Sequence, residues 1–149
     1  MQLTSSDFKE NMLIPARYTC QGQGINPELQ INNVPSEAIS LVLTMHDPDA
    51  PSGNFVHWLM WNIPATTTKI DEANVPKGVT EGITSASSAG YFGPCPGSGE
   101  HRYIFTLYAL DTTLKLKSET DLTGLQLAID DHILASTTLM GRYQKTAIA

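Results

Sequence analysis

The sequence is short of positive charge. Its 149 residues include 9 lysines and arginines against 15 aspartates and glutamates, a formal net charge of −6. Because a nucleic-acid-binding surface needs basic side chains to neutralise phosphates, this balance excludes nucleic acid as a general partner. It equally excludes an electrostatic attachment to anionic membranes. It still permits one small anion in a locally positive pocket.

Long apolar runs and cysteines are also scarce. No stretch approaches the roughly 20 apolar residues needed to cross a bilayer, so we predict no membrane insertion. The first residues, MQLTSSDFKEN, lack the basic and apolar regions of a signal peptide, so we predict a cytoplasmic location. The only cysteines, Cys20 and Cys95, show no metal-type spacing. In the cytoplasm we expect two reduced thiols, since a disulfide there would be unusual.

Short apolar segments separated by proline and glycine predict a mostly β protein. A hydrophobic fraction of 41% and a charged fraction of 16% are typical of a globular chain with a core. No repeat, low-complexity tract or domain boundary interrupts the chain, so we predict one domain over residues 1–149. Strands or extended segments are expected at residues 14–20, 29–31, 39–45, 57–63 and 103–110.

One helix is predicted near the C-terminus. Thr123 and Gln126 have the spacing of a capping box, and apolar residues at helical intervals follow until Gly141, a natural residue for a helix end. A short strand over residues 143–149 is expected to follow the helix. Residues 65–92 are weakly patterned and predict a long surface loop that can hold one short strand.

A proline-bounded acidic turn, DPDAP at residues 47–51, follows the strand over 39–45. Each proline fixes its own φ and biases the preceding residue toward extended geometry, so the turn can hold Asp47 and Asp49 in fixed directions. Asp-Pro pairs also occur in turns with no function. We expect Asp49 to be structural and to pair with Arg102, because both lie in otherwise charge-poor segments.

Two histidines begin strands beside such rigid turns. Period-two alternation places His57 and Trp58 on opposite faces of one strand, and His101 and Tyr103 on the same face of another. A lone histidine next to a tryptophan is more often a core residue than a ligand-binding one. Two histidines, each at a strand end beside a proline-rich turn, favour a binding site.

The loop GPCPGSG at residues 93–99 precedes His101. Glycine lets the backbone approach a ligand, and consecutive N–H groups can form an anion-binding nest. No Gly-Lys-Ser/Thr follows, so this is not a Walker loop. An ordinary surface turn is the alternative. We predict that this loop and the segment around His57 form the walls of one small anion pocket.

Taken together, DPDAP, VHW, GPCPG and HRYIFTLYAL resemble the phosphatidylethanolamine-binding protein family, also called Raf kinase inhibitor protein-like, and above all its bacterial and archaeal branch, typified by YbhB and YbcL. The resemblance covers nearly the whole chain. It implies an antiparallel β-sandwich with one C-terminal α-helix and long loops. It also implies a pocket for phosphate, a phosphorylated head group or a carboxylate. Matched by motif, the ligand-binding residues are Asp47, His57, Gly93, His101 and Tyr103, and the supporting residues are Asp49, Pro51, Pro94 and Arg102.

Three kinds of function fit these residues. The first is a binding module whose occupancy regulates a protein partner such as a kinase or a protease, with anion binding that strengthens as pH falls through the histidine range. The second is an enzyme, either a hydrolase with His57 or His101 as general base and Asp47 as orienter, or a metal-dependent enzyme using all three. The third is an interaction module with a vestigial pocket. We expect no catalytic residue, cofactor or metal, and a monomer or a homodimer.

Overall fold

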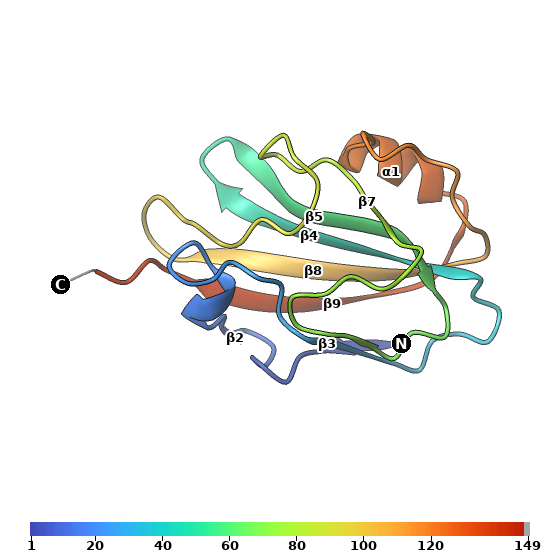
Figure 1. Cartoon of the computed structure of the whole chain (residues 1–149), viewed down its shortest axis with the longest axis horizontal. Helices are drawn as coiled ribbons and strands as arrows, with labels where there is room; N and C mark the ends of the chain where they lie inside the picture. Colours follow the sequence, from blue (N-terminus) through green and yellow to red (C-terminus); the bar gives the residue numbers. More distant parts are fainter. Residues whose placement is uncertain (148–149) are drawn as a thin grey trace.

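Two β-sheets form the molecule, of which the computed structural model describes residues 1–147 (Figure 1). The six-stranded sheet has the order β2 (Met12–Leu13), β9 (Ile133–Tyr143), β8 (His101–Leu110), β4 (Ser40–Ala50), β5 (Gly53–Pro64) and β7 (Thr80–Glu81). The three-stranded sheet has the order β1 (Gln2–Thr4), β3 (Leu29–Asn32) and β6 (Lys69–Ile70). Neighbouring strands are antiparallel except β2 and β9, which are parallel. The predicted β-sandwich is therefore confirmed.

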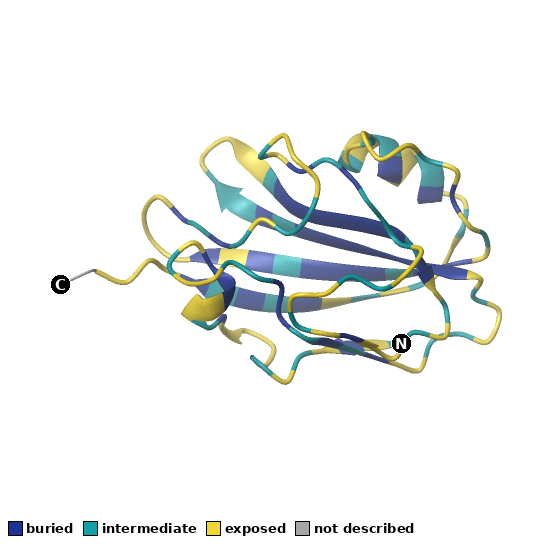
Figure 2. Cartoon of the chain, in the orientation of Figure 1, coloured by how far each residue is buried: buried dark blue, intermediate teal, exposed yellow. Residues whose placement is uncertain are grey.

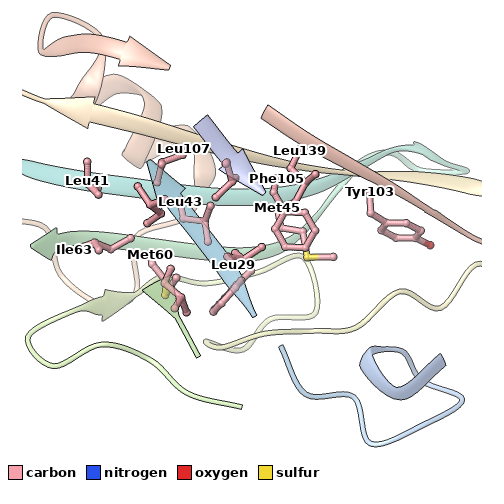
Figure 3. Close-up of a cluster of buried hydrophobic side chains, with 14 of the residues drawn as sticks. Leu29, Leu41, Leu43, Met45, Met60, Ile63, Tyr103, Phe105, Leu107 and Leu139 are labelled. Carbon is pink, nitrogen blue, oxygen red and sulfur yellow. The ribbon is translucent and has the colours of Figure 1, made fainter. Parts of the chain in front are cut away.

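The main core lies between the two sheets. Side chains of β4, β5 and β8 pack there against Leu29 and Ile31 of β3 (Figure 3). A second cluster lies on the opposite face of the large sheet, where Leu125 and Ile129 of the helix α1 (Leu122–Ile129) cover Trp61. Because β4 and β5 are buried on both faces, their sequences are almost continuously apolar instead of alternating. Figure 2 shows this burial along the central strands.

The predicted C-terminal helix is wrong in its second half. The helix α1 ends at Ile129, and its N-cap is Asp121, whose side chain accepts a hydrogen bond from the backbone N–H of Gly124, so Thr123 and Gln126 form no capping box. The following residues form β9, which pairs along the whole length of β8.

The physical reason for this error lies in the edge of β8. The segment ASTTL, residues 135–139, is rich in small and β-branched residues, and burial alternates from Leu139 to Tyr143 as expected for a strand. Pairing with the exposed backbone of β8 overrides the helical spacing of the apolar residues. The strand ends at Tyr143, so no final strand starts there, and residues 148–149 of that prediction lie outside the described part of the chain.

Two shorter predictions also need correction. The motif DPDAP is not a turn up to Pro51, because β4 continues to Ala50 and the hairpin turns at Pro51 and Ser52, with Gly53 at φ 104°. Pro48 is tolerated within the strand because the pairing with β5 is interrupted there. The segment expected to be extended at residues 14–20 contains a 3₁₀ helix, η1 (Ala16–Tyr18). The remaining predicted strands are present, but His57 does not begin its strand, because β5 starts at Gly53. The loop over residues 65–92 contains two short strands, β6 and β7, where one was expected.

The prediction of two reduced thiols is wrong. Cys20 and Cys95 form a disulfide that joins positions 75 residues apart. Disulfides of this kind persist mainly in oxidising compartments or in intracellular proteins of hyperthermophiles. The cytoplasmic location, from which the reduced thiols were inferred, stays a prediction. No helix among residues 1–147 is long and apolar enough to cross a membrane.

Candidate functional site

A pocket of about 330 Å³ opens where the β4–β5 hairpin meets the start of β8. Three segments that are distant in the sequence line it: the hairpin, the loop over residues 92–97, and the first residues of β8. The lining residues are Asp47, Ala50, Pro51, Ser52, Phe55, His57, Phe92, Cys95, Pro96, Gly97, His101 and Tyr103. The floor is polar and the rim is mostly apolar, which is the usual composition of a small-ligand site.

A β-bulge directs His57 into this pocket. Met45 pairs with Trp58 whereas the next residue, His46, pairs with Val56, so β5 has one extra residue at His57. The His57 ring therefore lies against Phe55 and Tyr103, with centroid distances of 4.9 and 5.2 Å. The predicted placement of His57 opposite to Trp58 is wrong, because simple alternation does not continue through a bulge.

One hydrogen bond to Phe92 fixes the His57 ring, and a second joins the two backbones. Its Nδ1 donates to the Phe92 carbonyl oxygen at 2.5 Å, and the Phe92 N–H donates to the His57 carbonyl oxygen at 2.9 Å. Because a carbonyl can only accept, the ring proton must be on Nδ1, which leaves Nε2 as the other nitrogen. Burial lowers the pKa of His57 below its usual value, despite the opposing effect of the Phe92 carbonyl. At neutral pH, His57 is therefore a neutral ring with an acceptor at Nε2.

The second histidine is held by a buried carboxylate. His101 Nδ1 donates to Asp47 Oδ2 at 2.6 Å, and Asp47 Oδ1 accepts from the backbone N–H of Asp49 at 2.7 Å. Asp47 is only 3% exposed, and both of its oxygens are hydrogen-bonded. It therefore orients His101 and does not present a bare negative charge to the pocket, while Nε2 is the remaining nitrogen of His101.

Tyr103 lies on the pocket floor with an unpartnered hydroxyl. The residue is 0% exposed. Within residues 1–147 its oxygen has no partner in good hydrogen-bond geometry, although the Asp47 side chain and the Cys95 backbone lie close enough to affect its pKa. Figure 3 shows this hydroxyl pointing away from the other labelled core side chains. Burial, and then the charge of Asp47, raise the pKa of Tyr103, so the hydroxyl keeps its proton and remains a donor. A buried donor without a partner is costly, which points to a ligand at this position.

The predicted pairing of Asp49 with Arg102 is present. Arg102 donates from Nε to Asp49 Oδ2 at 2.9 Å and from NH2 to Asp49 Oδ1 at 2.8 Å, and its backbone N–H also bonds Oδ2 at 2.9 Å. These bonds hold the pKa of Asp49 down at about 2. The pair ties the end of β4 to the start of β8 beside the pocket.

Gly93 and Pro94 do not line the pocket. A Cβ on Gly93 would lie 2.7 Å from the carbonyl oxygen of Tyr18, so glycine is required for the close approach of two backbones. Pro94 accepts a hydrogen bond from the backbone N–H of Cys20 at 3.1 Å. Both residues thus dock the loop over residues 92–97 onto the segment that contains η1. Pro51, in contrast, is on the rim.

Sequence reasoning missed the apolar rim. Phe55, Phe92 and His57 form a cluster of three rings, in which the Phe55 and Phe92 centroids are 5.8 Å apart and lie 4.9 and 5.7 Å from the His57 centroid. Ala50, Ser52, Pro96 and Gly97 complete the lining. The position of Phe55, two residues before His57, was an available signal for a shared face. Phe92 has no comparable signal, since it reaches the pocket only through the folding of a long loop.

The geometry bears on two alternative chemistries. Cys95 is bonded to Cys20 and therefore presents no thiol nucleophile. Within residues 1–147 no three His, Cys, Asp or Glu side chains are placed to hold a metal ion, so Asp47, His57 and His101 do not form the metal site considered above.

Comparison with known proteins agrees with the fold and the motifs. The family model described as phosphatidylethanolamine-binding protein matches residues 4–144. A UPF0098 protein of Methanothermobacter thermautotrophicus is 41% identical, covering 97% of this chain and 99% of the relative. For a UPF0098 protein of Pyrococcus horikoshii the identity is 42%, with coverage of 95% and 75%.

Two crystal structures are close matches. A phosphatidylethanolamine-binding protein homolog of Chlamydia trachomatis, CT736, superposes with a TM-score of 0.94 at 39% identity, covering 97% of each chain. YbcL of Escherichia coli superposes with a TM-score of 0.91 at 27% identity, covering 97% of this chain and 98% of its own. This chain thus belongs to the phosphatidylethanolamine-binding protein family.

Proposed function

We propose that this protein is a binding module for a small oxyanion, such as phosphate, a phosphorylated head group or a carboxylate. The observation that carries the proposal is the buried, unpartnered hydroxyl of Tyr103 on a pocket floor shared with two oriented imidazole rings. An oxyanion placed there would accept the hydrogen bond that Tyr103 otherwise lacks. Occupancy of the pocket would then regulate a protein partner.

The surroundings of this hydroxyl favour an anion. When His101 is protonated, its Nε2–H donates into the pocket, while Asp47 balances the positive charge from the opposite side of the ring. Tyr103 and His101 are buried, and hydrogen bonds are stronger in such surroundings of low dielectric constant. The aromatic and proline rim gives the apolar part of a phosphate ester or of a head group a surface to contact.

Calorimetric titration with inorganic phosphate tests the proposal. Tyr103→Phe keeps the ring and removes only the donor, so affinity should fall by about tenfold or more, the usual value for a hydrogen bond to a charged group. Tyr108→Phe is the matched control, since this half-buried tyrosine lies in the cluster beneath α1. Unchanged phosphate affinity in Tyr103→Phe, or no binding to the wild type, would count against the proposed function.

A further inference from the structure

We infer that His57 acts as a hydrogen-bond acceptor for the ligand and thereby selects oxyanions that carry an ionisable proton. Phosphate and phosphate monoesters, bound as monoanions, would be preferred over sulfate, which has no proton to donate near neutral pH. This inference rests on the proposed function and names the class of ligand.

The role of His57 as an acceptor follows from the hydrogen bond and the packing of its ring. The hydrogen bond from His57 Nδ1 to the Phe92 carbonyl oxygen holds the ring and commits Nδ1 to donation, while the backbone bond from the Phe92 N–H to the His57 carbonyl keeps the two residues side by side. The Phe55 and Tyr103 rings pack against it. Only Nε2 remains for a ligand, and in a neutral ring this atom can only accept.

The charged and titratable groups around His57 are few. Asp47 and His46 approach from β4, and His101 and Tyr103 from β8; of these, Asp47 raises the pKa of His57 while His46 and His101 lower it. Burial has the largest effect and favours the neutral ring. The Phe55 and Phe92 side chains, which complete the surroundings, bring no charge.

The pocket therefore pairs a fixed donor with a fixed acceptor. The donor is the Tyr103 hydroxyl and the acceptor is His57 Nε2. A phosphate monoanion satisfies both, because a deprotonated oxygen accepts from Tyr103 and its P–OH donates to His57. A sulfate oxygen at the same place would face the lone pair of Nε2, which leaves a buried acceptor unpaired and adds repulsion.

Titrations with inorganic phosphate and with sulfate at pH 6 show whether His57 Nε2 accepts a hydrogen bond from the ligand or donates one to it. The wild type should bind phosphate at least about tenfold more tightly than sulfate, the cost of one unpaired buried group. That ratio should fall as pH rises through the second ionisation of phosphate. Equal affinities for the two anions would overturn the inference, because they would mean that the ligand protonates His57 and that Nε2 then donates.

Two variants separate selectivity from affinity. In His57→Gln the side-chain amide can present a donor, so the phosphate-to-sulfate ratio should move toward one. Tyr103→Phe should weaken both anions by the same factor and leave the ratio unchanged. If His57→Gln fails to fold, the wild-type ratio still decides. If neither anion binds the wild type, the proposed function itself fails, and that result differs from equal binding of both.

Discussion

The Cys20–Cys95 disulfide gives the sharpest stability prediction. It closes a loop of 75 residues, and the chain-entropy relation gives about 4.5 kcal/mol at 25 °C for a loop of that size. Because a domain is stable by only about 5–15 kcal/mol in total, reduction should remove a large part of the stability. The reduced protein should unfold at a much lower urea concentration than the oxidised one.

The surrounding contacts predict that the reduced protein keeps its fold. Apart from the disulfide, two hydrogen bonds hold the loop over residues 92–97 in place. The Cys20 N–H donates to the Pro94 carbonyl oxygen, and the hydroxyl of the adjacent Tyr91 donates to the Tyr18 carbonyl oxygen at 2.7 Å. Gly93 keeps the two backbones in close approach. Reduction should thus act mainly on the unfolded state, which becomes more expanded and gives a larger m-value.

Urea unfolding followed by fluorescence, with and without a reductant that opens the bridge, measures this effect. The double variant Cys20→Ser, Cys95→Ser is the control, because its midpoint should match that of the reduced wild type and should not respond to the reductant. Identical midpoints for the oxidised and fully reduced wild type would refute the reasoning. Counting free thiols after unfolding verifies the redox state of each sample.

Three further predictions concern single positions and pH. Gly93→Ala should lower the free energy of unfolding by about 1–3 kcal/mol through its clash with the Tyr18 carbonyl, whereas Gly97→Ala, which meets nothing within 4 Å, should stay within about 0.5 kcal/mol in the same urea assay. Asp121→Ala removes the cap of α1 and should cost about 1 kcal/mol. The urea midpoint should fall in acid in two stages. The first comes below pH about 6.5, since His57 has a lowered pKa and binds its proton mainly when unfolded. The second comes as pH falls from about 4 toward 2, where Asp49 loses the charge that holds Arg102. A midpoint that stays constant from pH 7 to 3 would contradict both pKa directions.

Local sequence was enough to predict the central strands and the polar residues of the pocket, but not Phe55 and Phe92 of its rim. The segments of β4, β5 and β8 are apolar on both faces and bounded by proline or glycine, so their identity as strands follows from short-range pattern. The pairing of Asp49 with Arg102 could be predicted because both charges lie in apolar surroundings that offer few other partners. These are cases in which local preference and tertiary packing favour the same structure.

The prediction of the helix was wrong in its second half because that segment carries both a helical pattern and a strand pattern. Apolar residues at helical spacing run on from α1, yet the small and β-branched residues of β9 fit a strand equally well. The decision depends on β8, whose backbone donors and acceptors need a partner along its full length. A non-local requirement of this kind cannot be seen in the segment itself.

The direction of His57 depends on a single extra residue in β5, and this bulge is what makes the pocket chemically asymmetric. Without it, alternation would place the ring on the face away from Tyr103, and the floor would keep one histidine and one hydroxyl. With it, the ring enters beside Tyr103 and Nδ1 reaches the Phe92 carbonyl, which fixes an acceptor opposite the donors. Register is set by the pairing of whole strands and not by the residues next to the bulge. The polar residue types of this site could therefore be predicted from the sequence, whereas the positions of the hydrogen-bond donors and acceptors, from which we infer its selectivity, required the structure.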